Sequence, residues 1–239
     1  MIFGIRAVIE AIEAGKEIDK LLIKKDLQGD LSRELFNILK GRHIPVQRVP
    51  VEKLNRITRK NHQGVIAYTT QITYQHIEDI VPSLFEEGKN PFFVLLDGLT
   101  DVRNFGAIAR TAECAGVDAI IIPSKNSVSV NADAIKTSAG ALNYTPVVKV
   151  TNLAKTMEEL QDRGLWFVCA DMGGESMYRL NLTGPIGLVI GNEGEGVSRL
   201  VKEKCDFIAS IPMKGDIDSL NASVATGVLA YEIVRQRLQ

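Results

Sequence analysis

The stretch IPMKGDIDSLNASVATGVLAYEIVRQR, residues 211–237, joins the end of a predicted strand, a polar loop and a long helix. Small and hydroxyl-bearing side chains crowd the first turns of this helix, whereas Val224 and Leu229 belong to an apolar set that recurs at helical spacing. Free backbone amides at a helix start can bind a ligand, and short side chains let it approach closely. The same pattern also fits a plain helix start capped by Asp218 or Ser219. The stretch alone leaves both interpretations open.

Upstream of this stretch, from residue 91 onward, apolar strand segments alternate with helical segments. The predicted strands are FFVLLD, AIIIP, PVVKV, WFVCA, GLVIG and FIASIP, and the predicted helices cover residues 104–115, about 131–139, 152–163, 199–204 and the final stretch. Apolar strands separated by helices indicate a parallel sheet covered on both faces, in which ligands bind at the carboxyl ends of the strands. The fold class is therefore α/β.

The first 70 residues predict a separate small α/β domain. Helical patterns at about 3–15, 31–42 and 51–58 alternate there with strand patterns at 20–25, 44–49 and 64–70. The next segment, to about residue 90, is weakly patterned, holds one short helix candidate and is expected to be a linker. The predicted organisation is a small domain over 1–70, a linker over 71–90 and a large domain over 91–239.

Charge is unevenly distributed between these parts. The whole chain has a net charge of −1, but residues 1–70 carry 13 Lys and Arg against 8 Asp and Glu, a balance of +5, which leaves −6 for the remainder. A basic first domain favours RNA or another anionic partner, although solubility charge is an alternative.

The cysteines and histidines do not indicate a metal site. They are three each and isolated from one another: Cys114, Cys169 and Cys205; His43, His62 and His76. This spacing argues against zinc and against a disulfide framework, and it favours buried packing for the cysteines. The sequence has neither a leader pattern nor an apolar run of membrane length, so we expect a cytoplasmic protein without a membrane partner.

A first polar loop follows the strand FFVLLD and leads into the helix predicted from residue 104. Asn104 stands where an N-cap belongs, Gly106 allows close approach to the first turn, and Arg110 lies almost two turns inside the helix. Helical side chains lean toward the N-terminus, so the guanidinium of Arg110 could reach back to the loop. The alternative is a capping Asn104 and a solvated Arg110.

A second polar loop, LVIGNEGEGVS at residues 188–198, has glycines in the order G-x-x-G-x-G with Glu193 and Glu195 among them. Carboxylates would repel phosphate, so this loop is not a dinucleotide fingerprint. A cationic ligand such as the sulfonium and ammonium of S-adenosylmethionine fits it better, and a flexible surface turn is the alternative. The third such loop is the opening stretch, with Ser219 and Asn221.

Taken in order, these motifs resemble the SpoU/TrmH branch of the SPOUT RNA 2′-O-ribose methyltransferases. The matching segments are NFGAIAR at 104–110, KTSAGALNY at 136–144, GNEGEGVS at 191–198, IPM at 211–213 and SLNASVATG at 219–227. The N-terminal FGIRAVIEAI and the HQGV at 62–65 resemble the small RNA-binding module of bacterial members that act on ribosomal RNA. The resemblance covers nearly all of the large domain and is specific, because several motifs occur in the same order.

The resemblance implies a SPOUT-type parallel sheet whose C-terminal segment forms a trefoil knot, and a homodimer that packs through the knotted regions. It implies that S-adenosyl-L-methionine is held by backbone groups near Gly191, Ile211 and Leu220. The implied reaction is 2′-O-ribose methylation of a guanosine in large-subunit (23S) ribosomal RNA.

The resemblance also implies roles for the polar side chains. Arg110 is the residue nearest the attacking oxygen and is the family's proposed general base, while Asn104, Glu193, Ser219 and Asn221 arrange the substrate and the arginine. Because a guanidinium normally keeps its proton, an alternative is that Arg110 clamps the adjacent phosphate.

The first domain is expected to capture RNA through Arg42, Arg48, Arg56, Arg59 and Lys60. Since the motifs identify the reaction more firmly than the target, a tRNA guanosine 2′-O-methyltransferase is an alternative, and so is a noncatalytic RNA-binding assembly factor. The acidic glycine loop and the lack of G-x-G-x-x-G disfavour an NAD-dependent enzyme.

Overall fold

The computed structural model describes residues 1–42, 44–216 and 219–239, so His43 and the cap candidate Asp218 lie outside the described residues. The chain separates into two compact units, Met1–Thr73 and Tyr74–Gln239. Each unit has its own sheet and its own apolar core.

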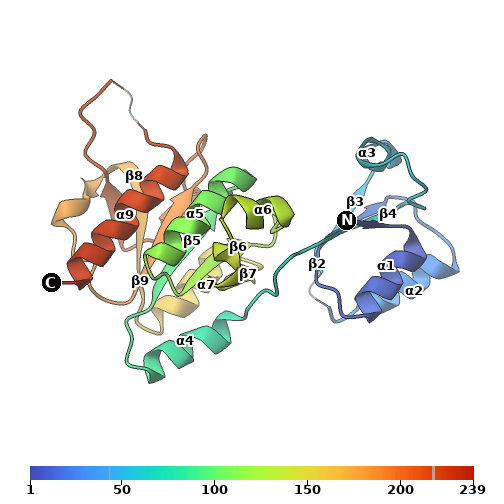
Figure 1. The fold of residues 1–239 in the computed structure, drawn as a ribbon, viewed down its shortest axis with the longest axis horizontal. Helices are drawn as coiled ribbons and strands as arrows, with labels where there is room; N and C mark the ends of the chain where they lie inside the picture. The colour runs from blue at the N-terminus through green and yellow to red at the C-terminus, as the bar shows by residue number, and fades with distance from the viewer. Residues whose placement is uncertain (43, 217–218) are drawn as a thin grey trace. The chain divides into compact units, whose positions relative to one another are not determined.

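The first unit is a four-stranded sheet with helices on both faces (Figure 1). Its elements are β1 (Ile2–Phe3), α1 (Ile5–Glu13), β2 (Ile18–Lys24), α2 (Asp30–Leu39), β3 (Val46–Val49), α3 (Val51–Ile57) and β4 (Val65–Thr69). The strand order is β1-β4-β2-β3, in which β2 and β3 are parallel and the other pairs antiparallel. Strand β1 was not expected from the sequence, because two residues are too short to form a periodic pattern.

The core of the first unit explains why the helical and strand patterns hold. Helices α1 and α2 pack against one face of the sheet, where Val8, Ile9 and Leu35 are buried. Helix α3 covers the other face through Leu54, which packs with Ile66. The apolar residues of each element recur with the period of that element, so burial on both faces follows from the sequence.

The second unit is a parallel sheet between two layers of helices (Figure 1). Its elements are α4 (Ile77–Glu86), β5 (Phe92–Asp97), α5 (Val102–Cys114), β6 (Ala119–Pro123), α6 (Ala132–Thr137), η1 (Ala141–Asn143), β7 (Val147–Val150), α7 (Leu153–Gln161), β8 (Trp166–Ser176), η2 (Met177–Arg179), β9 (Ile186–Gly191), α8 (Arg199–Lys202), β10 (Phe207–Ser210) and α9 (Ala222–Arg237). The strand order is β10-β8-β9-β5-β6-β7, and each neighbouring pair is parallel. The predicted α/β class is confirmed, whereas the trefoil knot stays a prediction.

Helix α4 lies inside the segment 71–90 that the sequence suggested as a linker. Its side chains Ile77, Val81 and Leu84 belong to the apolar core of the second unit, together with residues of α7. Pro82 lies within this helix and weakened the helical pattern in the sequence. The described fold therefore assigns α4 to the second unit.

Strand β8 is longer than the WFVCA segment predicted from the sequence, since it runs from Trp166 to Ser176. Gly173 and Gly174 lie inside it, although this pair suggests a turn. A Cβ atom at Gly174 would lie 2.3 Å from the backbone oxygen of Ile208 in β10. The glycine therefore permits close pairing with the edge strand, and only the tertiary contact reveals this.

The helix of the opening stretch, α9, packs against α5 in the second unit (Figure 1). Leu229 and Ile233 are buried as expected, whereas Val224 is half exposed. Asn221 caps the helix, because its Oδ1 accepts from the backbone N–H of Ser223 at 3.0 Å. The capping prediction for Ser219 was therefore wrong, since the helix begins two residues later.

None of the helices in the described residues combines the length and the apolar character needed to cross a bilayer.

Candidate functional site

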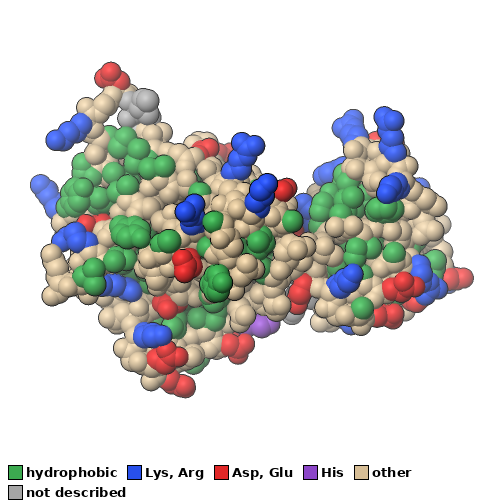
Figure 2. Space-filling view, viewed as in Figure 1, with side chains coloured by type: hydrophobic (Ala, Val, Ile, Leu, Met, Phe, Trp, Pro, Cys, Tyr) green, Lys and Arg blue, Asp and Glu red, His purple; other side chains and the backbone are tan. Residues whose placement is uncertain are grey.

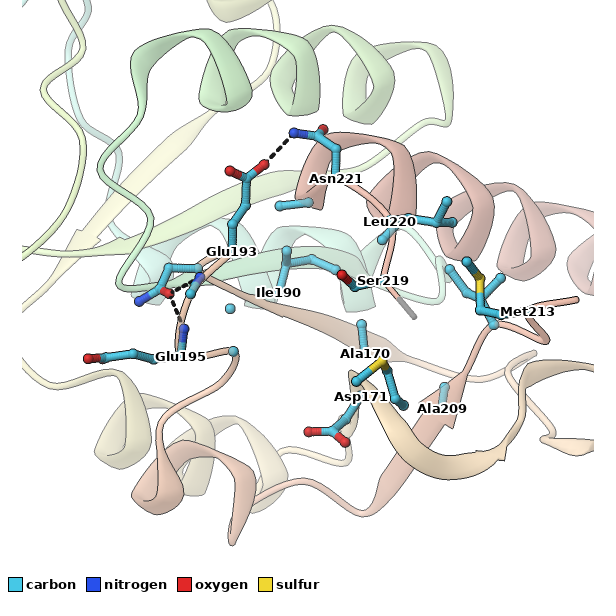
Figure 3. Close-up of a pocket in the computed structure, with 18 residues that line it drawn as sticks. Ala170, Asp171, Ile190, Glu193, Glu195, Ala209, Met213, Ser219, Leu220 and Asn221 are labelled. Carbon is cyan, nitrogen blue, oxygen red and sulfur yellow. Dashed lines mark hydrogen bonds between the residues drawn. The ribbon is translucent and has the colours of Figure 1, made fainter. Parts of the chain in front are cut away.

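A cavity of about 630 Å³ opens at the carboxyl ends of β9 and β10 and beside the middle of β8 (Figure 3). The loop 192–196, Ile211 and Met213 after β10, residues 219–221 and the first turn of α9 complete its wall. The predicted site residues that line it are Gly191, Glu193, Ile211, Ser219, Leu220 and Asn221. The cavity lies where parallel sheets ordinarily bind ligands, and two of the three polar loops meet there.

The loop 192–196 is held by the side chain and the backbone of Asn192. The Oδ1 atom of Asn192 accepts from the backbone N–H groups of Gly194, at 2.9 Å, and Glu195, at 2.7 Å. Asn192 and Gly196 also exchange two backbone hydrogen bonds, of 3.0 and 3.2 Å. The loop is therefore an exposed turn closed by hydrogen bonds, and the alternative of a flexible surface turn is not tested by these contacts.

Gly191 ends β9 where the returning loop crosses it. A Cβ atom there would lie 2.0 Å from the carbonyl carbon of Gly196 and 2.2 Å from the backbone nitrogen of Val197. Only glycine fits this crossing without displacing the backbone. At Gly191 the cavity is therefore lined by backbone atoms and not by a side chain.

The side chains of Asn104, Glu193 and Asn221 form one hydrogen-bonded cluster at the rim of the cavity. Asn104 Nδ2 donates to Glu193 Oε1 at 3.0 Å, and Asn221 Nδ2 donates to Asn104 Oδ1 at 3.0 Å. Asn221 Nδ2 also donates to Glu193 Oε1, and Figure 3 shows these two side chains directed toward each other. Three loops that are distant in sequence thus place three predicted residues together.

Asn104 is available for this cluster because another residue caps α5. Asp101 is the N-cap, and its Oδ1 accepts from the backbone N–H of Asn104 at 2.8 Å. The alternative in which Asn104 is the cap was therefore wrong. Its side chain instead projects from the first turn of α5 toward Glu193.

Arg110 lies apart from this cluster. Its side chain is exposed on α5, does not line the cavity, and has no hydrogen bond or ion pair within residues 1–42, 44–216 and 219–239. Its guanidinium is therefore free to contact a further molecule, and its role in the chemistry stays a prediction.

Gly106 serves packing between helices rather than approach by a ligand. A Cβ atom there would lie 2.6 Å from the Cβ atom of Thr137, next to the fully buried Ser138. The segment 136–144, which was part of the resemblance, thus packs against the helix that carries Asn104. This packing helps to hold α5, and with it Asn104, in place.

The charge of the cavity favours a cationic or neutral ligand. Carboxylates of Asp171, Glu193 and Glu195 belong to its lining, and no Lys or Arg does among the described residues. Apolar side chains such as Ile190 and Leu220 line the remainder. A ligand that combines positive charge with an apolar or aromatic part is complementary to this wall.

Asp171 was not identified from the sequence, although it directly follows the predicted strand WFVCA. Lys202 Nζ donates to Asp171 Oδ2 at 2.7 Å, and this hydrogen bond lowers the pKa of the Asp171 carboxyl below its ordinary value. The carboxylate is thus held ionised at the cavity wall. Its place directly after the predicted strand segment was the signal that could have found it, although β8 continues past it to Ser176.

The cysteines differ from the expectation of uniform burial. Cys169 is buried and Cys205 partly buried, whereas Cys114 is exposed. A hydrogen bond between the Cys169 and Cys205 thiols lowers the pKa of Cys169 and raises that of Cys205. Cys169 belongs to the apolar core, so these two thiols serve packing. Across the described part of the chain, no three His, Cys, Asp or Glu side chains are grouped as a metal ion would require.

Residues 91–231 match the model of the SpoU rRNA Methylase family. The chain belongs to the SpoU methylase family. A second model, described as RNA 2′-O ribose methyltransferase substrate binding, matches residues 1–75. The predicted family is thereby confirmed for the large domain, and the first unit corresponds to a recognised substrate-binding domain.

Curated relatives of this SpoU-family protein match it over its whole length. It is 40% identical to the Bacillus subtilis protein YacO, whose name assigns it to the TrmH family of tRNA/rRNA methyltransferases, over 99% of this chain and 95% of the relative. It is 42% identical to a Staphylococcus saprophyticus protein named for the same family, over 99% of this chain and 96% of the relative.

Solved structures of SpoU-family proteins are similar to this one. AviRb from Streptomyces viridochromogenes, solved with AdoMet, is 26% identical with a TM-score of 0.63 and covers 99% of this chain and 90% of its own. An AdoMet-bound rRNA methyltransferase from Sinorhizobium meliloti is 25% identical with a TM-score of 0.63, over 100% and 87%. The TrmH/SpoU tRNA modifying enzyme of A. aeolicus is 31% identical with a TM-score of 0.58, over 63% and 77%.

Proposed function

We propose that this SpoU methyltransferase transfers a methyl group from S-adenosylmethionine to the 2′-hydroxyl of a guanosine in large-subunit ribosomal RNA. The observation that carries the proposal is the cavity at the strand ends, where a backbone wall meets the Asn104–Glu193–Asn221 cluster. S-adenosylmethionine supplies an activated methyl group on a sulfonium. The residues of this chain supply binding, orientation and charge.

The residues present fit this cofactor. Gly191, Ile211 and Leu220 line the cavity and would hold the cofactor largely through backbone and apolar contacts. Glu193 and Asp171 both line the cavity, and their carboxylates make its wall complementary to positive charge. The volume of about 630 Å³ lies within the range typical of small-molecule sites.

The polar cluster is proposed to orient the substrate ribose. Asn221 and Asn104 fix the carboxylate of Glu193 at the rim, and Ser219 lies in the same wall. The 2′-hydroxyl must lose its proton as it accepts the methyl group, and Arg110 is proposed to act at that oxygen or on the adjacent phosphate. The phosphate contact suits a guanidinium that keeps its proton.

The first unit favours ribosomal RNA over tRNA. The Sinorhizobium meliloti structure named as an rRNA methyltransferase covers 100% of this chain. Two similar structures whose names mention tRNA cover 63% and 62% of it. This coverage agrees with a target that requires the additional substrate-binding unit, whereas the names of the curated relatives include both kinds of RNA.

A homodimer is proposed through the exposed apolar side chains of α9. Val224 and Tyr231 are each 50% exposed, and their spacing of seven residues places them on one side of the helix, while Leu238, the C-cap residue, is 82% exposed. Figure 2 shows hydrophobic side chains gathered on this part of the second unit. Light scattering on the purified protein should give twice the chain mass, whereas a monomer at micromolar concentration would contradict the dimer.

Two measurements test the proposed reaction. Ribosomal RNA and tRNA from cells that lack this protein are mapped for 2′-O-methylation, and the purified protein is then incubated with both RNAs and labelled S-adenosylmethionine. We expect methylation to be lost in those cells, and restored by the protein, at one guanosine of the large-subunit RNA. Loss in tRNA alone would overturn the ribosomal target, and RNA binding without methyl transfer to any RNA would support an assembly factor.

A further inference from the structure

A second cavity, of about 550 Å³, lies in the first unit. It is bounded by the segment 24–28 after β2, by α3, and by the loop 60–64 before β4. None of the predicted catalytic or cofactor-binding residues belongs to it.

A buried histidine orients an exposed amide at this cavity. His62 is only 8% exposed, and its Nδ1 accepts from the backbone N–H of Gly64 at 3.0 Å. The ring proton therefore lies on Nε2, which is 2.9 Å from Asn55 Oδ1 and donates to it. The amide oxygen of Asn55 is thus used, and its Nδ2 donors have no partner among the described residues.

The loop that carries His62 is fixed on both sides. Gln63 has φ of +51°, and its Oε1 accepts from the backbone N–H of Ile5 at 3.0 Å. A Cβ atom at Gly64 would lie 2.9 Å from Leu27 and 3.2 Å from Lys24, so the backbone there packs directly on the opposite wall. A left-handed residue that is not glycine costs conformational energy and marks sites that require a particular geometry.

Positive charge surrounds the cavity. Lys24 and Lys60 line it, and Asp26 is the carboxylate on its wall. Neither lysine forms an ion pair within the described residues, and Lys60 Nζ lies 5.8 Å from the centre of the Phe3 ring. Figure 2 shows Lys and Arg side chains gathered over α3, whereas toward α1 and α2 Asp and Glu side chains are mixed with Lys and Arg. Unpaired ammonium groups beside free amide donors are complementary to phosphate and to the acceptor atoms of a base.

We propose that this cavity receives an unpaired nucleotide of the RNA substrate. Asn55 donates to an acceptor on the edge of the base, Lys24 and Lys60 contact the flanking phosphates, and His62 positions Asn55. Paired RNA conceals base edges in a deep groove, so a preformed amide in a cavity selects bases that are out of the helix. This inference depends on one part of the proposed function, namely that the protein binds RNA.

The test compares a labelled, fully paired hairpin RNA with a bulged form of it that carries one extra nucleotide, and the bulged form is made with each of the four bases. Binding to the full chain is measured by fluorescence anisotropy without cofactor. We expect the bulged RNA to bind about tenfold more tightly, which corresponds to one good base-edge contact. Asn55→Ala should remove this preference, and Asn37→Ala, an exposed asparagine on α2, should keep it.

The role of His62 is tested through Asn55. His62→Ala should reduce the preference in the wild-type background and have no further effect in the Asn55→Ala background, because it acts only by orienting that amide. Thermal unfolding of each variant separates a loss of structure from a loss of positioning. Additive effects in the double variant would assign His62 a separate role.

The outcomes distinguish this inference from the proposed reaction. If Asn55→Ala binds both hairpins as the wild type does, or if the wild type shows no preference, the nucleotide cavity is overturned while methyl transfer can still occur. If the wild type prefers the bulged RNA, Asn55→Ala loses this preference and no methyl transfer is found, the nucleotide cavity is supported and the proposed reaction is contradicted.

Discussion

At the residue scale, Arg110 combines an exposed guanidinium with the absence of any hydrogen bond or ion pair in the described part of the chain. A side chain that acts only on the RNA should affect turnover and leave the cofactor site intact. We predict that Arg110→Ala lowers methyl transfer by about 10²-fold or more, the range for a positioned proton-transfer group. The dissociation constant of S-adenosylmethionine, measured by calorimetry, should change little. Full turnover in this variant would remove Arg110 from the mechanism.

Asn221 has two functions that substitutions can separate. Its Oδ1 caps α9, and its Nδ2 donates to both Asn104 and Glu193. Asn221→Ser keeps a capping oxygen but loses the amide donors, whereas Asn221→Ala loses both and costs about 1 kcal/mol of stability. We expect both variants to lose methyl transfer at least tenfold, and only the alanine variant to unfold earlier in urea. A serine variant with normal turnover would contradict the role of the cluster.

The ion pair of Asp171 with Lys202 has a pH dependence with a definite sign. The hydrogen bond from Lys202 lowers the pKa of Asp171, so the native state favours the ionised carboxyl. The resulting stability is present above the ordinary pKa of aspartate and is lost as the pH falls through the lowered value. The difference in unfolding free energy between wild type and Asp171→Asn should therefore be constant from pH 7 to about 5 and shrink at lower pH. Urea titrations over this range check it, and a difference that grows on acidification would contradict it.

At the element scale, the last turn of α9 is bonded to the amino ends of the central strands. Arg237 donates to the backbone oxygens of Asn90 at 3.1 Å, Pro91 at 3.0 Å and Gly184 at 2.7 Å. Gln236 adds bonds to Leu182 and Leu180. The helix that begins at the site is thus anchored at its far end by a fork of donors that reaches several carbonyls at once.

This anchor predicts a stability effect without a direct effect on chemistry. In Arg237→Lys, one ammonium group cannot donate to three separated carbonyls in place of the guanidinium. The site is also partly buried, and this burial lowers the pKa of the Arg237 guanidinium. We expect a loss of about 2 kcal/mol in unfolding free energy. Denaturant unfolding measures it, and Arg163→Lys is the control, because this arginine after α7 is exposed and its side chain has no bond among the described residues. Equal stability of both variants would contradict the anchoring role.

At the scale of the whole molecule, the first unit supplies the basic surface and the second unit supplies the acidic cavity. Arg56 and Arg59 are exposed and have no ion pair among the described residues. Arg42 and Arg48, by contrast, bond to the backbone oxygens of Ile12 and Lys25. Among the arginines expected to contact RNA, those near the end of α3 are therefore the freest to do so.

The salt dependence of RNA binding should report this difference. We predict that Arg56→Gln combined with Arg59→Gln lowers the slope of log affinity against log salt by about 0.7 for each phosphate that the protein no longer neutralises. Lys16→Gln combined with Arg33→Gln removes the same charge from exposed positions at α1 and α2 and serves as the control. Equal slopes for the two double variants would show that α3 has no special part in RNA binding.

Several elements were predictable because their patterns are local. The apolar faces of α1 and α7, and the buried runs of β5 and β9, repeat with the period of a helix or fill a strand that is covered on both sides. The prediction for β8 stopped short because Gly173 and Gly174 carry no local strand signal. The cap of α5 was misplaced because Asp101 and Asn104 are both good caps, and only the folded backbone chooses between them.

The sequence by itself determined the α/β class, the family, the strand-end positions of the three polar loops and the basic character of the first 70 residues. Each of these depends on composition or on neighbours within a few positions. The tertiary structure alone decided that Asn104 meets Glu193 and Asn221 across separations of 89 and 117 residues, that Asp171 joins the same cavity, and that Gly106 faces α6. Such contacts arise from the order in which parallel strands lie side by side, and no local pattern encodes that order.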